Sequence, residues 1–388
     1  MLKKLAIIGS TGSIGRQTLE VITAHPDKLK VVALAAGKNN LEEFAEQIKK
    51  FMPQVVSVPH EQAVSELRSL LGNIRVEILI GEDGLNAIAA APESDLLVTA
   101  IVGFAGVKPT IKALEKGKTI ALANKETLVA AGSIIMKLVD QAEGKIIPVD
   151  SEHSAIHQSL RGEQLSQLKH IWLTASGGPF RTWTNQQIDN ATIDDALQHP
   201  NWSMGKKITI DSATMMNKGL EIIEARWLFN CQINQIKVVI HPQSILHSAV
   251  EFCDGSVVGQ FGLPDMKLPI HYALFYPERV EFTGGPIIDL CKLSNLTFEA
   301  PDYDKFPCLK IAQDVACDDS TAACVLNSAN EVIVDAFLQG QIRFKDIPNS
   351  LIRVLDKHKA IKTPTLEDIF ESDKWARSEA ATILKALV

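Results

Sequence analysis

Residues 1–149 alternate short β-branched runs with helical patterns, and this alternation constrains the fold more than any other feature of the chain. The candidate strands are Leu5–Ile8, Val31–Ala36, Val55–Val58, Ile78–Ile80, Leu96–Ile101, Thr119–Ala123 and Ile146–Val149. Between the second and third runs, one helical stripe is formed by Leu41, Phe44, Ala45, Ile48 and Phe51. Such alternation predicts a mostly parallel sheet with helices on both faces. We therefore expect an α/β protein whose first domain, residues 1–149, is Rossmann-like.

The first strand–helix junction has the sequence GSTGSIG, residues 9–15. Glycines permit a tight turn and let backbone N–H groups approach a pyrophosphate at the start of the following helix. A plain glycine turn is the alternative. The position after the first strand of a β–α series favours a dinucleotide site.

The end of the second strand indicates which dinucleotide is bound. NAD-preferring sites usually offer an Asp or Glu there to bind the ribose hydroxyls. This chain has Gly37-Lys38-Asn39-Asn40 instead. A lysine and amides suit a 2′-phosphate, and no carboxylate repels it, so we expect NADP.

A cluster of polar residues, Asp150-Ser151-Glu152-His153, follows the last predicted strand. If the strand continues, Asp150 and Glu152 are two residues apart and project to the same side. Two carboxylates facing one way favour a divalent cation between them. The alternative is a polar loop in which Asp150 or Ser151 caps the next helix.

A second informative stretch is DSATMMNKGLE, residues 211–221. A helical pattern starts near Lys218, so Asn217, Lys218 and Glu221 can share one face. Ser212, Asn217 and Lys218 form a good phosphate clamp, with the lysine as point charge. Glu221 would supply a third carboxylate to the metal, although a simple Lys–Glu surface pair is the alternative.

Other candidate site residues lie in loops. Asn124, Lys125 and Glu126 follow a strand of the predicted parallel sheet, at the edge where such folds bind ligands. Ser176 and two glycines after a predicted strand can hold an anionic group. Residues 199–207, HPNWSMGKK, have the composition of a lid over a small polar ligand, although Trp202 could simply pack on the core. His241 and His247 are each expected to be packed structural histidines, with a place in the lining of the site as the alternative.

Composition excludes several classes of function. A net charge of −7 and a pI near 5.8 disfavour nucleic acid or an anionic membrane as the main partner. No apolar stretch approaches transmembrane length, and the run Leu5–Ile8 is too short for a signal peptide. The six cysteines lack CxxC spacing, as in reduced cytosolic proteins. We expect a cytoplasmic protein.

The remainder of the chain divides into three segments. Residues 150–290 are expected to form an α+β catalytic domain with a lid loop, and residues 291–307 a linker. Helical patterns over 308–317, 321–339, 345–358 and 373–387 predict a C-terminal helical bundle, residues 308–388, that supports the site.

Ten motifs together resemble the 1-deoxy-D-xylulose 5-phosphate (DXP) reductoisomerase family. They are GSTGSIG (9–15), AGKNN (36–40), ANKET (123–127), PVDSEH (148–153), TASGGPFR (174–181), HPNWSMGKK (199–207), DSATMMNKGLE (211–221), HPQSILHS (241–248), LPDMKLPI (263–270) and LNSANE (326–331). They occur in family order over all the predicted domains. Thr127 and Lys267 stand where the family often has Ser and Arg.

The resemblance implies a role for individual residues. Asp150, Glu152 and Glu221 would bind Mg²⁺ or Mn²⁺, and together with Lys125 would be the catalytic residues. The phosphate would be held by Ser176, Ser212, Asn217 and Lys218, while Lys125, Ser151 and His199 contact the rest of the substrate and Trp202 and Met204 close over it. NADPH would be contacted by Thr11, Gly12, Ser13, Ile14, Gly37, Lys38, Asn39, Asn124, Glu126 and Gly205.

The reaction implied by the resemblance is a rearrangement of DXP followed by reduction to 2-C-methyl-D-erythritol 4-phosphate, in the non-mevalonate pathway of isoprenoid biosynthesis. Lys125, Glu152 and metal-bound water are all candidates for proton transfer. A homodimer is expected from the family alone. The alternatives are a homoserine-dehydrogenase-like NADP oxidoreductase, which does not explain residues 150–221, and a non-enzymatic NADP-sensing regulator, which needs no acidic residues.

Overall fold

The computed structural model describes residues 2–37, 40–142, 144–202, 204–293 and 295–387, which form two compact units. Unit 1 comprises Met1–Asn124, Ile135–Ser154 and Asp265–Pro286, and unit 2 comprises Lys125–Ile134, Ala155–Pro264 and Ile287–Val388. Lys38 and Asn39, both expected to contact NADPH, lie outside the described residues. The division into four segments expected from the sequence stays a prediction.

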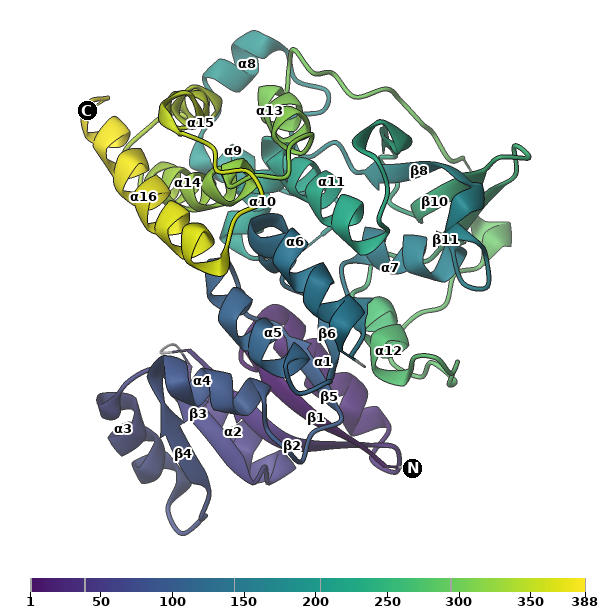
Figure 1. Cartoon of the computed structure of the whole chain (residues 1–388). Coiled ribbons are helices and arrows are strands. Elements are labelled where there is room, and N and C mark those ends of the chain that lie inside the picture. Colours follow the sequence, from purple (N-terminus) through teal and green to yellow (C-terminus); the bar gives the residue numbers. More distant parts are fainter. Residues whose placement is uncertain (1, 38–39, 143, 203, 294, 388) are drawn as a thin grey trace. The chain divides into compact units, whose positions relative to one another are not determined.

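Unit 1 is built on a seven-stranded parallel sheet of order β4-β3-β2-β1-β5-β6-β7 (Figure 1). Its strands are β1 (Lys3–Ile8), β2 (Leu29–Ala35), β3 (Val55–Val58), β4 (Glu77–Ile80), β5 (Leu96–Thr99), β6 (Thr119–Leu122) and β7 (Ile146–Pro148). The four residues Leu5–Ile8 are all fully buried, as expected where helices cover both faces of a sheet. The predicted Rossmann-like α/β architecture is confirmed.

The helices of unit 1 pack on this sheet and on one another. They are α1 (Ser13–Ala24), α2 (Leu41–Phe51), α3 (Glu61–Leu71), α4 (Gly81–Ala89), α5 (Val107–Leu114) and α12 (Lys267–Phe275). α2 contacts α3, α4 contacts α5, and α12 contacts α1. The predicted stripe of α2 buries Leu41, Phe44, Ala45 and Ile48 in the core of unit 1, to which residues of α12 also contribute.

The chain passes between the units within two helices. α6 (Lys125–Gln141) has a non-helical residue at Ala131, and α7 (Ser151–Ser159) begins directly after β7. The first residues of α6 therefore belong to unit 2, whereas the first residues of α7 belong to unit 1.

Unit 2 contains a four-stranded sheet of order β11-β10-β8-β9. The strands are β8 (Leu168–Ala175), β9 (Ile236–Ile240), β10 (Leu246–Phe252) and β11 (Val257–Phe261); β8 and β9 are parallel, and β10 is antiparallel to both β8 and β11. Between β8 and β9 lie α8 (Asn185–Asp189), α9 (Ile193–Leu197), α10 (Lys206–Ala213) and α11 (Met216–Leu228). The expected mixture of strands and helices in this region is confirmed.

The C-terminal part of unit 2 is helical, as predicted. It comprises α13 (Pro307–Val315), α14 (Ala322–Leu338), α15 (Asp346–Lys357) and α16 (Leu366–Lys385). α14 packs against both α15 and α16, and α13 packs against α11 (Figure 1). α16 begins at Leu366, earlier than its apolar pattern indicated, because Thr365 and Asp368 form a capping box.

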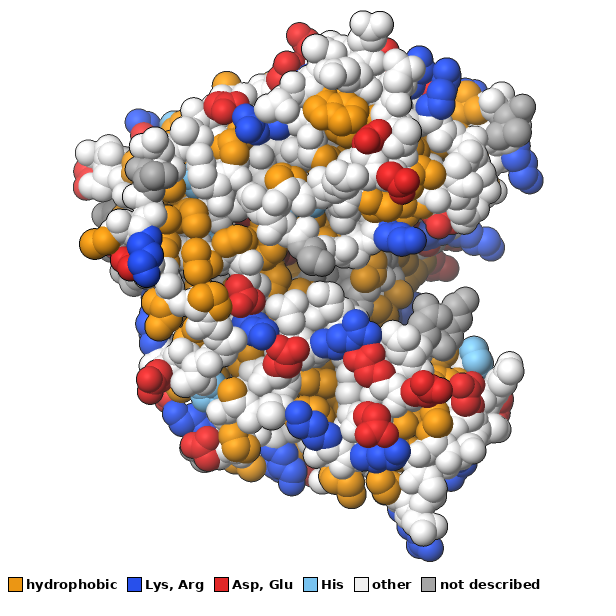
Figure 2. All heavy atoms as spheres, turned by 180° about the vertical axis from the view of Figure 1, so that it is seen from behind, with side chains coloured by type: hydrophobic (Ala, Val, Ile, Leu, Met, Phe, Trp, Pro, Cys, Tyr) orange, Lys and Arg blue, Asp and Glu red, His pale blue; other side chains and the backbone are white. Residues whose placement is uncertain are grey.

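The surface carries charges of both signs. On the face drawn in Figure 2, basic and acidic side chains are interspersed, in keeping with a modest net charge of −7. Among the described residues, no helix has the length and apolarity needed to cross a membrane.

Candidate functional site

In unit 1, the glycine-rich turn connects β1 to α1. Gly9 has a φ of +84°, and a Cβ there would lie 2.4 Å from Ala100 O; a Cβ on Gly15 would lie 2.3 Å from Gly9 O. Only glycine fits such close approaches. The turn brings Thr11, Gly12, Ser13 and Ile14 to the N-terminal end of α1, where backbone N–H groups can bind an anion.

Two other predicted cofactor residues lie at the same edge of the sheet. Gly9 N and Ser10 N donate to Ala35 O of β2, at 2.8 and 3.0 Å, so the exposed Gly37 follows close to the turn. Asn124, which is buried, donates from Nδ2 to Ile101 O (2.9 Å) and Gly103 O (3.0 Å). Asn124 therefore braces the loop after β5 from the end of β6.

The carboxylates after β7 do not continue a strand. β7 ends at Pro148 and α7 begins at Ser151, and Ser154 N donates to Asp150 O at 2.8 Å. The argument that strand periodicity directs Asp150 and Glu152 to one side is therefore wrong. Both carboxylates stand at a helix N-terminus instead, where the helix dipole favours negative charge. Ser151 Oγ donates to Glu152 Oε2 at 2.6 Å.

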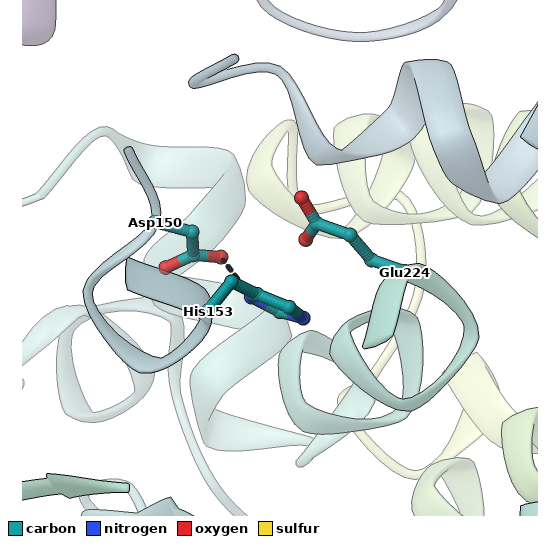
Figure 3. A group of neighbouring side chains, drawn as sticks. All are labelled: Asp150, His153 and Glu224. Atoms are coloured by element: carbon teal, nitrogen blue, oxygen red, sulfur yellow. Dashed lines mark ion pairs between the residues drawn. The ribbon is translucent and has the colours of Figure 1, made fainter. Parts of the chain in front are cut away.

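His153 is a residue that sequence reasoning left out of the site. Its ring is fully buried, and its Nδ1 lies 3.7 Å from Asp150 Oδ2. Figure 3 marks this ion pair with a dashed line. The two residues are three apart, a spacing that matters only once the segment is recognised as helical. The imidazole therefore limits the orientations available to the Asp150 carboxylate.

In unit 2, the carboxylate of Glu221 lies at the centre of a buried charged cluster. Lys125 Nζ lies 3.1 Å from Glu221 Oε1, and Lys218 Nζ donates to Glu221 Oε2. Asn217 Nδ2 donates to the same Oε1 at 2.6 Å and Asn217 Oδ1 accepts from Lys125 Nζ at 2.7 Å. The prediction that Asn217, Lys218 and Glu221 share one helix face is confirmed.

The charged side chains of the Glu221 cluster are buried. Those of Lys125, Lys218 and Glu221 are 7%, 4% and 1% exposed, so they are not the simple surface pair considered as the alternative. Buried charges require partners, and both lysines contact the Glu221 carboxylate.

Glu224, an acidic residue, is the second residue of this region that sequence reasoning missed. It lies one turn beyond Glu221 on α11, is 1% exposed, and is labelled in Figure 3. A Glu-x-x-Glu spacing on a helix places both carboxylates on one face. That spacing was visible in the sequence, but a second glutamate on an amphipathic helix is usually a surface residue.

Ser176 and His199 are joined by a hydrogen bond in unit 2. Ser176 Oγ lies 2.9 Å from His199 Nε2 and accepts from Gly178 N at 3.2 Å. His199 Nδ1 accepts from Asn201 N and Trp202 N, at 3.2 and 3.0 Å, so its proton is assigned to Nε2. Ser176 Oγ thus accepts two hydrogen bonds, which leaves its own O–H to donate to a ligand.

The turn after β8 also contacts the segment that carries Ser212. Gly178 has a φ of +68°, and a Cβ there would lie 2.5 Å from Ser212 O. Only glycine permits this approach of two backbones. The turn that follows Ser176 therefore lies against the backbone of Ser212, another residue expected to hold a phosphate.

The loop expected to act as a lid is shorter than predicted. α10 begins at Lys206, so Lys206 and Lys207 belong to a helix and the loop ends at Gly205. Asn201 Nδ2 donates to Pro242 O (2.6 Å) and to Ser244 Oγ (3.0 Å). The Trp202 ring lies 6.2 Å from that of His247, and Met204 and Trp202 are half-buried.

His241 is a structural residue, as expected. Its Nδ1 lies 2.9 Å from Thr297 O, and its Nε2 accepts from Ile245 N and Leu246 N, both at 3.2 Å. Its ring stacks on Phe298. Every polar atom of the imidazole is used to shape the turn between β9 and β10.

Taken separately, the two units present complementary chemistry. Unit 1 offers a glycine turn for a dinucleotide and two carboxylates at a helix start. Unit 2 offers a buried cluster that contains two lysines, and a serine whose hydroxyl can donate to an anion. These features fit a small anionic substrate better than a macromolecule.

Comparison with known families identifies the chain. Residues 5–132 match the model of 1-deoxy-D-xylulose 5-phosphate reductoisomerase. Residues 146–229 match the C-terminal domain model of that enzyme, and residues 261–379 match the DXP reductoisomerase C-terminal domain. The three models cover most of the chain.

Whole proteins and solved structures agree with these matches. The 1-deoxy-D-xylulose 5-phosphate reductoisomerase of Pelotomaculum thermopropionicum is 52% identical over 387 residues and 100% of both chains. The Zymomonas mobilis enzyme in complex with NADPH is 39% identical, with a TM-score of 0.92 over 99% of this chain and 100% of that one. A DOX-P reductoisomerase in complex with NADPH, fosmidomycin and magnesium is 41% identical, with a TM-score of 0.92 over 100% of this chain and 99% of that one. The chain belongs to the 1-deoxy-D-xylulose 5-phosphate reductoisomerase family.

Proposed function

We propose that this chain converts DXP to 2-C-methyl-D-erythritol 4-phosphate, using NADPH and a divalent cation, in the non-mevalonate pathway of isoprenoid biosynthesis. The observation that carries the proposal is the buried cluster of Lys125, Asn217, Lys218 and Glu221. A full-length relative bears the name of this enzyme, and a structural neighbour contains NADPH and magnesium.

The metal would be held by Asp150, Glu152 and Glu221. These ligands are all carboxylates, and an all-oxygen set fits Mg²⁺ or Mn²⁺ rather than a softer ion. A divalent cation supplies Lewis acidity, polarising the carbonyl of the substrate and fixing its neighbouring hydroxyl. The Glu221 carboxylate of α11 is held in one place by its contacts with Lys125 of α6 and Lys218 of α11.

The phosphate of the substrate would be bound by Ser176, Ser212, Asn217 and Lys218. Ser176 has a hydroxyl proton to donate because its oxygen already accepts from His199 and Gly178. Lys218, which contacts Glu221, would contribute a point charge to the phosphate.

The rest of the substrate would lie against Lys125, Ser151, Glu152 and His199. The loop that contains Trp202 and Met204 would close over it and exclude water, because an aldehyde awaiting reduction needs a dry pocket. Lys125 and Glu152 are the residues of the chain that we propose for moving protons. Lys125 Nζ is buried and already within reach of two oxygens.

NADPH supplies the hydride for the reduction. The residues proposed to contact it are Thr11, Gly12, Ser13, Ile14, Gly37, Lys38, Asn39, Asn124, Glu126 and Gly205. The support for this assignment is the glycine turn of unit 1, in which Gly9 and Gly15 leave no room for a side chain. The first turn of α1 is then open to the pyrophosphate.

The proposal is tested by following NADPH oxidation with DXP, with and without a chelator. Asp150→Asn is expected to abolish turnover and to leave NADPH binding intact. Asp254→Asn, in an exposed turn, is the matched control and should behave as the wild type. Absence of turnover, turnover that survives metal removal, or loss of NADPH binding in Asp150→Asn would each contradict the proposal. Turnover of DXP would also exclude a homoserine-dehydrogenase-like enzyme and an NADP-sensing regulator.

We further propose that the protein is a cytoplasmic homodimer. All six cysteine thiols are free, which suits a reducing compartment. β11 is an edge strand whose Val257, Val258 and Phe261 are 60%, 43% and 42% exposed, and an apolar edge of this kind is suited to covering by a second copy. Sedimentation velocity should show a dimer that Val258→Lys weakens; a monomeric wild type would contradict this part of the proposal.

A further inference from the structure

A buried ion pair lies on α10, the helix that follows the proposed lid loop. Lys207 Nζ is 2.8 Å from Asp211 Oδ2, four residues along the helix, and the Asp211 side chain is only 1% exposed. A lysine that precedes its acidic partner is the weaker order for stabilising a helix. Helix formation alone therefore gives little reason for this pair.

Both oxygens of Asp211 are engaged. Asn330, fully buried on α14, donates from Nδ2 to Asp211 Oδ1 at 2.8 Å. Lys207 Nζ also lies 3.4 Å from Oε1 of Glu126, in the first turn of α6. One ammonium thus joins two carboxylates, and the helices α6, α10 and α14 of unit 2 are linked through Glu126, Lys207, Asp211 and Asn330.

The ammonium form of Lys207 is strongly favoured. Burial by itself would lower the pKa of Lys207, but Asp211 and Glu126 raise it above its usual value. The lysine therefore keeps its charge, and the links to both carboxylates persist, throughout the pH range in which an enzyme of this kind would work.

The residues that flank this pair on α10 belong to the proposed binding site. Gly205, proposed to contact NADPH, immediately precedes the helix, and Ser212, proposed to bind phosphate, follows Asp211. The backbone of Ser212 also packs against Gly178, where a Cβ would be only 2.5 Å away. A small shift of α10 would thus displace contacts to both ligands.

We propose that Asp211, held by Asn330 and paired with Lys207, is a positioning residue that sets the place of α10 and Glu126 for binding of DXP and NADPH. This inference rests on the proposed function for the identity of the two ligands. The C-terminal bundle then does more than cover the core, because Asn330 of α14 fixes the orientation of a carboxylate on the helix that carries the phosphate contact.

The test compares Asn330→Leu with Ser328→Ala. Ser328 is a matched control because it is equally buried on α14 and also donates to a carboxylate, Asp373 Oδ1 at 2.6 Å, but that carboxylate lies on α16. In Asn330→Leu the KM values for DXP and NADPH should rise about tenfold with a smaller change in kcat, since binding groups are displaced. Ser328→Ala should stay within about twofold of the wild type. Equal KM values in the two variants would overturn the proposal.

A second pair of variants serves if Asn330→Leu does not fold. The Lys207 side chain is 20% exposed, so its replacement is better tolerated. Lys207→Met should raise both KM values, and Lys207→Arg, which keeps a charge between Asp211 and Glu126, should restore them. A Lys207→Arg protein as impaired as Lys207→Met, or a Lys207→Met protein like the wild type, would contradict the proposal.

Hydrogen exchange separates this inference from the proposed function. Without any ligand, amides of residues 206–213 should exchange faster in Asn330→Leu than in Ser328→Ala, since α10 has lost its tie to α14. Unchanged exchange would overturn the positioning role whatever the substrate proves to be. A wild-type protein that does not turn over DXP would instead refute the proposed function alone.

Discussion

The Glu221 cluster predicts that the glutamate contributes more to the stability of unit 2 than either lysine. The 3.1 Å contact from Lys125 Nζ to Glu221 Oε1 corresponds to an attraction of about 5 kcal/mol at an effective dielectric constant of about 20. Lys218 makes a second such contact. Desolvation offsets much of both, so removing the shared carboxylate by Glu221→Gln should cost about 3 to 5 kcal/mol, because two buried ammonium groups lose their counter-charge.

Lys218→Met is the informative comparison. It leaves the contact between Lys125 and Glu221 in place and removes only one of the two lysine contacts to the shared carboxylate. The expected cost is about 2 kcal/mol, that of one hydrogen bond to a charged group. In the double variant the two costs should not add, because the single substitutions remove the same interaction.

Urea unfolding followed by tryptophan fluorescence measures these costs. All five tryptophans, Trp172, Trp183, Trp202, Trp227 and Trp375, lie in unit 2, so the signal reports on the unit that contains the cluster. A chelator is present in all samples, because a divalent cation that bound only the wild type would stabilise it relative to the variants. The reasoning is refuted if Glu221→Gln unfolds at the wild-type urea concentration, or if Lys218→Met proves to be the less stable variant.

Three other perturbations have defined outcomes. Gly178→Ala should raise the KM for DXP about tenfold, because its Cβ would push on Ser212 O. Gly255→Ala is the control: its φ is also positive, +87°, but the space around it is open, so KM should stay within about twofold of the wild type. Equal effects of the two substitutions would exclude the close approach as the cause. Burial, and after it His25, lower the pKa of His271 to about 4, so the unfolded chain takes up the proton at a higher pH than the folded chain does. Unit 1 should therefore lose up to about 3 kcal/mol of stability between pH 6.5 and pH 4. Hydrogen exchange in α12 should show this loss in the wild type and not in His271→Phe. Burial raises the pKa of the Cys231, Cys308 and Cys324 thiols to about 12, so these three should react slowly. A thiol titration of the native protein should therefore modify only the other three cysteines rapidly. Rapid modification of more than three would contradict this expectation.

The sheet of unit 1 could be predicted from the sequence because its strands are buried on both faces. Such strands are continuous apolar runs, and Leu5–Ile8 or Leu96–Thr99 can hardly be anything else between glycines and polar residues. The helix stripe of α2 was equally clear, as four of its five predicted residues are buried in the core. Local periodicity determines both features, and local periodicity is what a single sequence contains.

The carboxylates after β7 show where this reasoning fails. Ile146–Pro148 pairs with β6, and Val149 N still donates to Leu122 O, so the apolar run is a strand until the residue before Asp150. The change to α7 occurs within two residues, at the point where chemistry begins. A strand and a helix would point the side chains of Asp150 and Glu152 in different directions. The contact between His153 and Asp150, three residues apart, forms only if the segment is helical. Periodicity over a dozen residues cannot locate such a change, because boundaries are set by capping and tertiary contacts.

The polar residues of α14 raise a different difficulty, since their partners are distant in sequence. Asn330 and Ser328 are fully buried on α14, and each donates to a carboxylate on a different neighbouring helix, Asp211 on α10 or Asp373 on α16. A buried amide costs free energy unless it is paired, so its presence in an apolar stripe is itself a signal that a partner exists. The motif LNSANE contains this signal, but the sequence does not show which carboxylate pairs with each polar residue. Once the partner of Asn330 is known to be Asp211, beside Ser212, this asparagine is no longer an exception in a helical pattern but the residue that we propose to hold the phosphate site in place.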